Sequence, residues 1–152
     1  MAQRVSWDEY FLQIATLAAT RSTCLRRNVG CVLVRDRHVL ATGYNGVPAK
    51  APHCADKGCL RQECNIPSGQ RMDICRAVHA EANAIAQCAK LGVCVQGATA
   101  YVTVTPCSKC AALLVQAGVT AVVSSGVYPD EDTKAILEEA NVTVKIIPMA
   151  GA

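Results

Sequence analysis

Three metal-binding side chains in two short motifs constrain most strongly how this chain can fold. His79 is followed two residues later by Glu81, and a Pro-Cys-x-x-Cys motif starts further on at Pro106 and supplies Cys107 and Cys110. One imidazole and two thiolates provide three of the four ligands of a tetrahedral zinc ion, and water can take the fourth position. A fold that uses all three must bring two separate segments to one point.

The composition indicates an ordinary α/β domain. The 152 residues are enough for one domain with a real core, so we expect a single domain over residues 1–152 with a cysteine-rich insert at about 49–76. Half of the chain is apolar and few residues are aromatic, which suits a core of small aliphatic side chains. The net charge of +3 argues against a dedicated nucleic-acid binder and is compatible with a small anionic substrate.

The sequence also predicts a cytoplasmic protein. No apolar run approaches the ~20 residues that span a bilayer, so we expect no membrane association. The N-terminal segment carries Arg4, Asp8 and Glu9 where a signal peptide would have an apolar core. In a reducing compartment, clustered cysteines such as those among the ten of this chain more often bind metal than form disulfides.

The first half of the chain predicts one helix and one hairpin. A helix over residues 6–20 begins with a capping box made by Ser6 and Glu9. Its core-facing side is expected to carry Trp7, Phe11, Ile14 and Leu17 or Ala18. Two β-rich runs, 29–35 and 39–44, flank a turn at 36–38 and predict an antiparallel pair. Residues 49–73 lack periodicity and would form a long irregular loop unless something else ordered them.

In the second half, helices and strands alternate. The expected helices cover residues 79–91, 107–117 and 132–140, and the expected strands cover 99–105, 119–124 and 142–147. Alternation of this kind predicts parallel strand pairing with right-handed crossovers. Together with the hairpin, it predicts a mixed sheet with helices on both faces.

This layout places the two motifs at the starts of two helices. His79 and Glu81 are expected in the first turn of one helix, and Cys107 and Cys110 in the first turn of the next. Both N-termini favour thiolate and hydroxide, so they can converge on one ion. A closed structural zinc site with a fourth protein ligand is the alternative, but it does not need Glu81 at that offset.

The same motifs predict a reaction. The pattern H-x-E followed by P-C-x-x-C is typical of zinc-dependent nucleobase deaminases. Zinc lowers the pKa of a bound water towards ~7. Glu81 would take the proton from that water, which attacks an aminopyrimidine, and pass protons to the ring nitrogen and the departing ammonia.

Beyond the zinc motif, the chain resembles the deoxycytidylate (dCMP) deaminases of the cytidine deaminase superfamily over roughly residues 5–147. The matching segments are Arg21-Ser-Thr-Cys24, Arg26 with Val29-Gly30, Gly43-Tyr-Asn-Gly46, Cys75 to Ile85 and Gln116-Ala-Gly118. The zinc motif indicates only the superfamily. Gly43-Tyr-Asn-Gly46 and the cysteine-rich insert favour the dCMP branch.

The resemblance implies a three-layer α-β-α cytidine deaminase-like fold with a mixed five-stranded sheet. It implies a hydrolase of pyrimidine nucleotide metabolism that converts dCMP to dUMP and ammonia and so supplies dTMP synthesis. Asn45 would contact the sugar hydroxyl, and the backbone near Ala80 would hold the base. Many members are allosteric hexamers that dCTP with Mg²⁺ activates and dTTP inhibits, so a homo-oligomer, with a hexamer favoured, is expected.

Other contacts of the nucleotide are open from the sequence. Arg26 and Arg27 precede a strand and can bind a phosphate through bidentate hydrogen bonds, or they can form a solvated basic turn. Asn45 precedes a glycine and can serve as a turn residue instead of a substrate ligand. Tyr128 can line the pocket or lie in a surface loop.

A second group of cysteines lies in the insert. Cys54, Cys59, Cys64 and Cys75 are enough for a closed structural zinc site, which would order a segment poor in apolar residues. Some dCMP deaminases carry such a second zinc. Free thiols, a redox disulfide, or a ligand set in which His53 replaces one cysteine are the alternatives.

Two other functions compete with dCMP deamination. One is a deaminase that acts on another cytosine nucleotide or nucleoside, or on a base in tRNA or single-stranded DNA. The chain has no basic, aromatic-rich stretch for polymer contacts, so we expect no stable nucleic-acid partner. The other is a zinc-ribbon-like interaction module built on the insert, which leaves Glu81 and the Asn45 loop unexplained.

Overall fold

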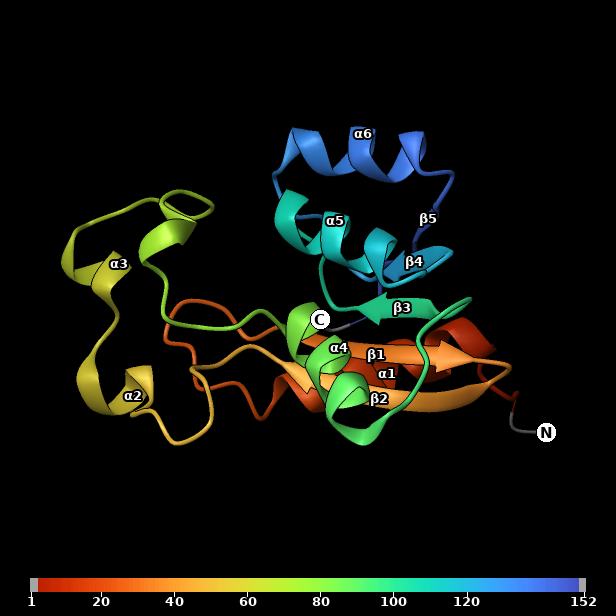
Figure 1. Ribbon diagram of the computed structural model, residues 1–152, viewed down its shortest axis with the longest axis horizontal. Coiled ribbons are helices and arrows are strands. Elements are labelled where there is room, and N and C mark those ends of the chain that lie inside the picture. Colours follow the sequence, from red (N-terminus) through yellow and green to blue (C-terminus); the bar gives the residue numbers. More distant parts are fainter. Residues whose placement is uncertain (1–2, 151–152) are drawn as a thin grey trace.

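A five-stranded mixed sheet in the order β2-β1-β3-β4-β5 organises the protein (Figure 1). The computed structural model describes residues 3–150. Its strands are β1 (Gly30–Arg35), β2 (His38–Tyr44), β3 (Thr99–Val102), β4 (Ala121–Ser124) and β5 (Thr143–Ile146). Its longer helices are α1 (Trp7–Ala19), α4 (Ala80–Leu91), α5 (Ser108–Gln116) and α6 (Glu131–Glu139). None of the helices within residues 3–150 combines the length and the hydrophobicity needed to cross a membrane.

The predicted hairpin is confirmed. β1 and β2 pair antiparallel, and Asp36 and Arg37 between them have φ angles of 52° and 62°. Two consecutive left-handed residues form the tight turn that matches the twist of a hairpin. His38, expected in the turn, is instead the first residue of β2.

The predicted parallel pairing is confirmed for the second half of the chain. β3 pairs with β4 and β4 with β5, both parallel, while β1 joins β3 antiparallel. The strand expected over residues 99–105 ends at Val102. Beyond it, Thr105 donates its backbone N–H to the Gly126 carbonyl, so this segment leaves the sheet and runs towards the cysteine motif.

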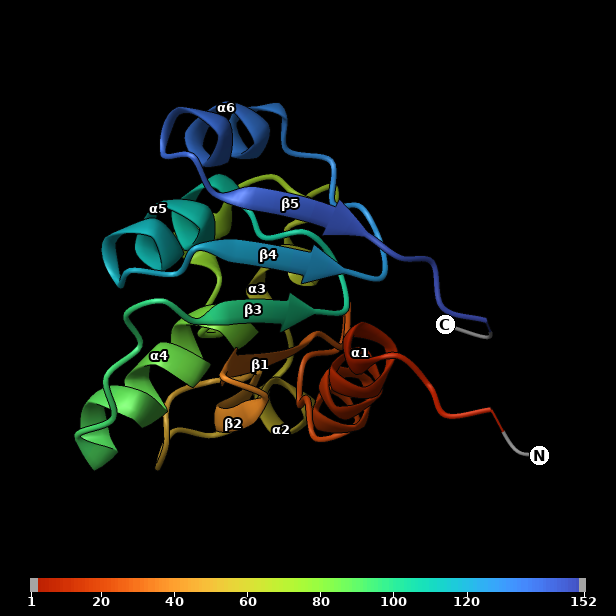
Figure 2. The same ribbon diagram turned by 90° about the vertical axis from the view of Figure 1, so that its right-hand side faces the viewer.

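Helices cover both faces of the sheet, which confirms the three-layer fold (Figure 2). On one face, α1 packs Phe11 and Leu12 against Val32 and Tyr101. On the other face, α4, α5 and α6 cover a larger core that is made mostly of alanine, valine and leucine side chains. The residues of that core are Cys31, Leu33, Ala41, Ala80, Ala84, Cys88, Val95, Ala98, Ala100, Val102, Ala111, Leu114, Val119, Val122, Leu137 and Val142.

The buried face of α1 is the predicted one only in part: Phe11 and Ile14 pack in the core as expected, but other predicted positions do not. The capping box at Ser6 and Glu9 forms as expected, but Trp7 is 44% exposed and Leu17 is 69% exposed. The contact surface uses Ala15 and Ala19 instead. A side chain at Gly30 of β1 would collide with the Ala15 carbonyl oxygen, so the helix approaches the sheet too closely for large residues along this line. Periodicity alone did not reveal this backbone contact.

The cysteine-rich insert, residues 49–76, forms a separate wall beside the sheet (Figure 1). It contains the single-turn helices α2 (Cys54–Lys57) and α3 (Leu60–Glu63) and the 3₁₀ turn η1 (Met72–Ile74). An irregular loop was expected here. Its short helices are not marked by apolar periodicity, because one turn is too short to show a period.

Candidate active site

The three predicted metal ligands lie at the starts of α4 and α5. His79 is the N-cap of α4, Cys107 is the N-cap of α5, and Cys110 lies in the first turn of α5. The sequence predicted His79 and Cys107 as the first residues of their helices, whereas each is the residue just before the first turn. The Asp130 carboxylate accepts a hydrogen bond from the Ser108 N–H at 2.7 Å and so completes the start of α5. Two helix N-termini with their positive dipole ends thus meet at one point.

The three side chains fit a zinc ion. The Nδ1 atom of His79 lies 3.4 Å from the Cys107 Sγ and 3.5 Å from the Cys110 Sγ. Tetrahedral zinc with ordinary Zn–N and Zn–S bonds separates such atoms by roughly 3.5 Å. Among the residues from 3 to 150, no fourth side chain joins this cluster. The donor set is therefore that of a site with one open position, not a closed structural site.

The local charges favour a thiolate at Cys107. A hydrogen bond from Cys110, helped by His79, lowers the pKa of Cys107 to about 4 against the opposing effect of burial. The hydrogen bond with Cys107 also raises the pKa of His79. Zinc is bound by thiolate sulfur and neutral imidazole, so metal binding would displace the protons that these groups share.

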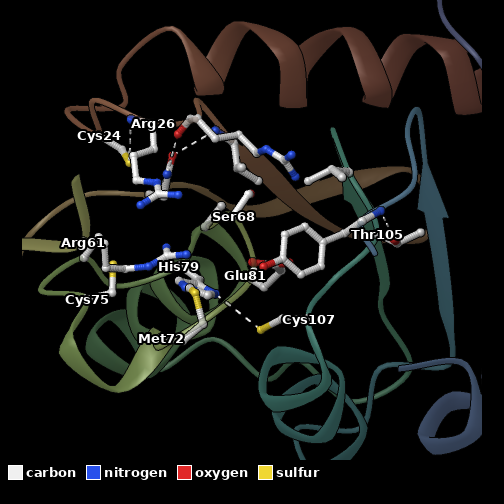
Figure 3. Close-up of a pocket in the computed structure, with 18 residues that line it drawn as sticks. Cys24, Arg26, Arg61, Ser68, Met72, Cys75, His79, Glu81, Thr105 and Cys107 are labelled. Atoms are coloured by element: carbon white, nitrogen blue, oxygen red, sulfur yellow. Dashed lines mark hydrogen bonds between the residues drawn. The ribbon is translucent and has the colours of Figure 1, made fainter. Parts of the chain in front are cut away.

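Glu81 lies beside the three predicted metal ligands but is not one of them. It is 3% exposed, and burial raises its pKa. Glu81, His79 and Cys107 face the same cavity (Figure 3). A buried carboxylate with a raised pKa can hold and release a proton near neutral pH, as a general acid–base requires.

The cavity lies between the sheet, the insert and the loop that carries Tyr128. Ala80, the first residue of α4, lines it, and its backbone N–H belongs to the helix turn that has no intrahelical acceptor. A two-way backbone bridge between Gly46 and Val78 fixes this end of α4 against the Asn45 loop.

Asn45 is at once a turn residue and a cavity residue. Its Oδ1 accepts hydrogen bonds from the Val29 N–H at 2.8 Å and the Ser22 hydroxyl at 2.6 Å. Its Nδ2 donates to the Arg27 carbonyl at 2.7 Å. The side chain is 8% exposed and lines the cavity, with one N–H of the amide beyond these three bonds.

The two arginines of the preceding loop also line the cavity. Arg26 is partly exposed and Arg27 is exposed. The Arg27 guanidinium lies 5.3 Å from the centre of the Tyr128 ring, a cation–π distance. Tyr128 itself lines the cavity, so of the two interpretations of this residue the structure favours the pocket position.

The insert does not assemble the expected second metal site. Cys54 and Cys59 are buried, but Cys64 is exposed and no three of the insert's ligand atoms lie within 4.8 Å of one another in the described chain. His53 is exposed as well. Cys54 is the first residue of α2, whereas Cys59 and Cys64 are the residues that flank α3 on either side.

The structure adds cavity residues that sequence reasoning missed. Arg61, Ser68, Gly69 and Met72 of the insert line the cavity, as does Cys75, which was expected to bind metal elsewhere. No spacing marks Arg61 in the sequence, because it lies in a segment without periodicity and becomes a cavity residue only when the insert folds beside the sheet.

Known proteins share the fold and the sequence. Residues 5–125 match the family described as the cytidine and deoxycytidylate deaminase zinc-binding region. The deoxycytidylate deaminase of Mycobacterium phage D29 is 46% identical over 133 residues, which cover 84% of this chain and 98% of the phage protein. The deoxycytidylate deaminase of Saccharomyces cerevisiae is 43% identical over 93% of this chain. The chain spans 45% of the length of that yeast relative.

A solved structure agrees with both. The dCMP deaminase of cyanophage S-TIM5, in complex with dCMP and dUMP, superposes with a TM-score of 0.80 and 26% identity. The match covers 96% of this chain and all of the phage chain. Sequence, fold and ligand cluster therefore agree, and the chain belongs to the cytidine and deoxycytidylate deaminase family.

Proposed function

We propose that the protein is a zinc-dependent hydrolase that converts dCMP to dUMP and ammonia. The observation that carries this proposal is the three-ligand cluster of His79, Cys107 and Cys110 with Glu81 buried beside it in one cavity. The names of the relatives, deoxycytidylate deaminases from yeast and phage, support dCMP as the substrate.

The mechanism assigns one role to each side chain. Zinc held by His79, Cys107 and Cys110 would supply a Lewis acid that makes water acidic near neutral pH. Glu81 takes one proton from the attacking water and passes it to the ring nitrogen. It then takes the second proton from the hydroxyl added to the ring carbon and gives it to the amino group, which leaves as ammonia as the C–N bond breaks and the carbonyl forms. Its burial suits this task, because the raised pKa brings its proton affinity closer to the working pH.

The rest of the cavity holds the nucleotide. The free backbone N–H of Ala80 accommodates the base, and the remaining N–H of Asn45 donates to the sugar hydroxyl. Arg26 and Arg27 supply positive charge for the phosphate at the far side of the cavity. The Ser22 and Val29 bonds to Asn45 keep its amide in place for this contact.

A substrate panel tests the proposal. Zinc-loaded protein is assayed for ammonia release from dCMP, cytidine, dCTP and a cytosine-containing oligonucleotide. We expect turnover of dCMP in clear excess over the others. Turnover of the oligonucleotide alone would replace the proposal with deamination of a base in a nucleic acid, and turnover of cytidine alone would replace it with a nucleoside deaminase.

Further features are proposed from the family resemblance. We propose one domain over residues 1–152 with its insert at 49–76, although residues 1–2 and 151–152 lie outside the described part. A second structural zinc in the insert, activation by dCTP with Mg²⁺, inhibition by dTTP, a hexameric assembly and a cytoplasmic location remain predictions. Zinc analysis tests the second site directly: two ions per chain would support it, and one ion per chain would mean that the insert is metal-free.

A further inference from the structure

The insert contributes one buried charged residue, Arg61, to which the proposed mechanism assigns no role. Arg61, in α3, is 6% exposed and lines the cavity together with Arg26 and Arg27. Figure 3 shows its side chain entering from the insert side, towards His79. It is the most buried of the three cavity arginines.

Few groups of the protein satisfy this guanidinium. One Nη donates to the Pro67 carbonyl at 3.3 Å, and the buried Nε has no acceptor. Within residues 3–150, no carboxylate forms an ion pair with Arg61. An unpaired buried cation is costly, and an arginine offers five donors in a planar fork. The side chain therefore lacks an anionic partner of its own.

Arg61 shares the cavity with two other arginines. Arg26, Arg27 and Arg61 line the cavity, and among the described lining residues Glu81 is the one acid. Burial raises the pKa of Tyr128, and the charges of Arg61 and Arg27 both oppose that rise. Arg27 and Arg61 come from different segments and line the same cavity as Tyr128, so an anion bound in that cavity is attracted by both guanidinium groups.

We infer that Arg61 binds the 5′-phosphate of the nucleotide and makes the site prefer nucleotides to nucleosides. The inference rests on the proposed function, because it assumes a nucleotide substrate. Arg27 is exposed and stacks on Tyr128, so water can satisfy its charge. Arg61 is buried and held in place by α3, so it can offer a fixed bidentate contact to a phosphate.

Ligand binding tests the inference without relying on turnover. Titration calorimetry compares the product dUMP with deoxyuridine on the zinc-loaded wild type and on Arg61→Gln and Arg61→Lys. Arg71→Gln is the matched control, because Arg71 lies in the same insert but is exposed, pairs with Asp73 and does not line the cavity. Zinc content and thermal unfolding without ligand are measured for each variant.

The expected result is a loss confined to the phosphate-bearing ligand. Arg61→Gln should bind dUMP roughly 10- to 100-fold more weakly than the wild type and bind deoxyuridine equally well. Arg61→Lys should lose about 10-fold, because an ammonium cannot replace the fork. Without ligand, Arg61→Gln should unfold at the wild-type temperature or above it, since an unpaired buried charge is removed.

Two results would overturn the inference. One is a wild type that binds dUMP no better than deoxyuridine, and the other is a dUMP affinity that neither Arg61 substitution changes. If Arg61→Gln does not fold, Arg61→Lys alone decides. Failure of the proposed function is a different outcome: the wild type would bind dUMP through Arg61 and yet deaminate no cytosine compound in the substrate panel.

Discussion

Glu81 combines three properties that single it out among the twelve acidic residues of the chain. It is buried, it lines the cavity, and it lies two residues after the predicted metal ligand His79 without belonging to the ligand cluster. A carboxylate in that place can exchange protons with water and substrate.

Glu81→Gln is expected to abolish most activity while leaving the fold and the metal in place. Glutamine has the same shape and cannot shuttle a proton, so kcat should fall by at least ~100-fold. Steady-state assays with dCMP and metal analysis measure the two effects. Glu139→Gln, at an exposed position at the end of α6, is the matched control and should keep full activity. Wild-type turnover by Glu81→Gln would remove the proton-shuttle role.

Asn45 shows how one residue serves both the fold and the site. Its amide joins three segments, through Ser22, Arg27 and Val29, and still faces the cavity. The Asn-Gly pair alone suggested a turn, and the resemblance suggested a substrate contact. Both uses are compatible, because the three internal hydrogen bonds leave one N–H of the Asn45 amide available for a substrate.

Asn45→Ala is therefore expected to cost stability as well as activity. Removing the amide leaves the Val29 N–H and the Arg27 carbonyl, both in part-buried hydrogen bonds, without these partners, which predicts a loss of about 3 kcal/mol in the free energy of unfolding. Denaturant titration measures it. Ser22→Ala leaves the Val29 and Arg27 bonds of the amide intact. It removes only the hydroxyl, which donates to the side-chain and backbone oxygens of Asn45 and accepts from the Cys24 N–H, so it should cost less, about 1 kcal/mol. Equal losses for the two variants would contradict this account of Asn45.

At the scale of elements, the site depends on how closely α4 lies against β2. A side chain at Gly43 of β2 would collide with the Ala80 carbonyl oxygen and lie 2.6 Å from the Ala84 nitrogen. These are backbone atoms of the helix whose first residues carry the catalytic groups. The glycine thus sets the height of α4 above the sheet, and with it the position of His79 relative to Cys107.

Gly43→Ala is expected to shift α4 and weaken metal binding. The added methyl has no flexible neighbour to displace, so the helix must move or the protein must lose stability, by about 1–3 kcal/mol. Zinc affinity, measured by competition with a chelator, should fall with it. Thr42→Ala, the exposed neighbour on the same strand, should change stability by less than ~0.5 kcal/mol. An unchanged zinc affinity in Gly43→Ala would mean that the packing of α4 at Gly43 does not control the metal site.

These elements also show what the sequence could and could not predict. Local signals were sufficient for the capping box of α1, the hairpin turn and the alternation of helices with strands, because each depends on neighbours in the chain. The exposed Trp7 and the cavity position of Arg61 depend on which backbones approach each other, at Gly30 and at the insert. No periodicity encodes such contacts between distant segments.

The candidate site follows the same division. His79, Glu81, Cys107 and Cys110 could be named from spacing, since metal geometry demands those residue types near helix starts. The expected four-thiolate site in the insert had no such short spacing, and the described chain does not bring those sulfurs together. Wide spacing leaves the directions of the side chains undetermined until the intervening turns fold.

At the scale of the whole molecule, one polar contact ties the first helix to the last strand. The Asp8 carboxylate of α1 pairs with the Lys145 ammonium of β5 at 2.6 Å and accepts a hydrogen bond from the Tyr101 hydroxyl of β3 at 2.8 Å. β5 is the edge strand of the sheet. This contact joins residues 137 positions apart, so it forms only when the entire sheet is in place.

The contact makes stability depend on pH in a defined direction. Burial alone would raise the pKa of Asp8, but the hydrogen bonds from Lys145 and Tyr101 outweigh it and lower the pKa. A carboxyl whose pKa is lower in the folded state stabilises that state above its unfolded pKa of about 3.9. The contribution is lost as the pH falls through the folded pKa, where the carboxyl becomes neutral.

Asp8→Asn should reproduce the acid state at neutral pH. The amide keeps an acceptor for Tyr101 but loses the charge that attracts Lys145, so the variant should be less stable by roughly 0.5–1 kcal/mol at pH 7. The difference should shrink as the pH falls below the unfolded pKa of about 3.9 and vanish below the folded-state pKa, where the wild-type carboxyl is protonated as well. Urea titrations of both proteins at each pH measure the difference, in which any effect of acid on the metal site is shared. Asp36→Asn, in the exposed hairpin turn, should show no difference at any pH, whereas a gap between Asp8→Asn and the wild type that does not shrink with acid would mean that the charge of Asp8 does not hold α1 to β5.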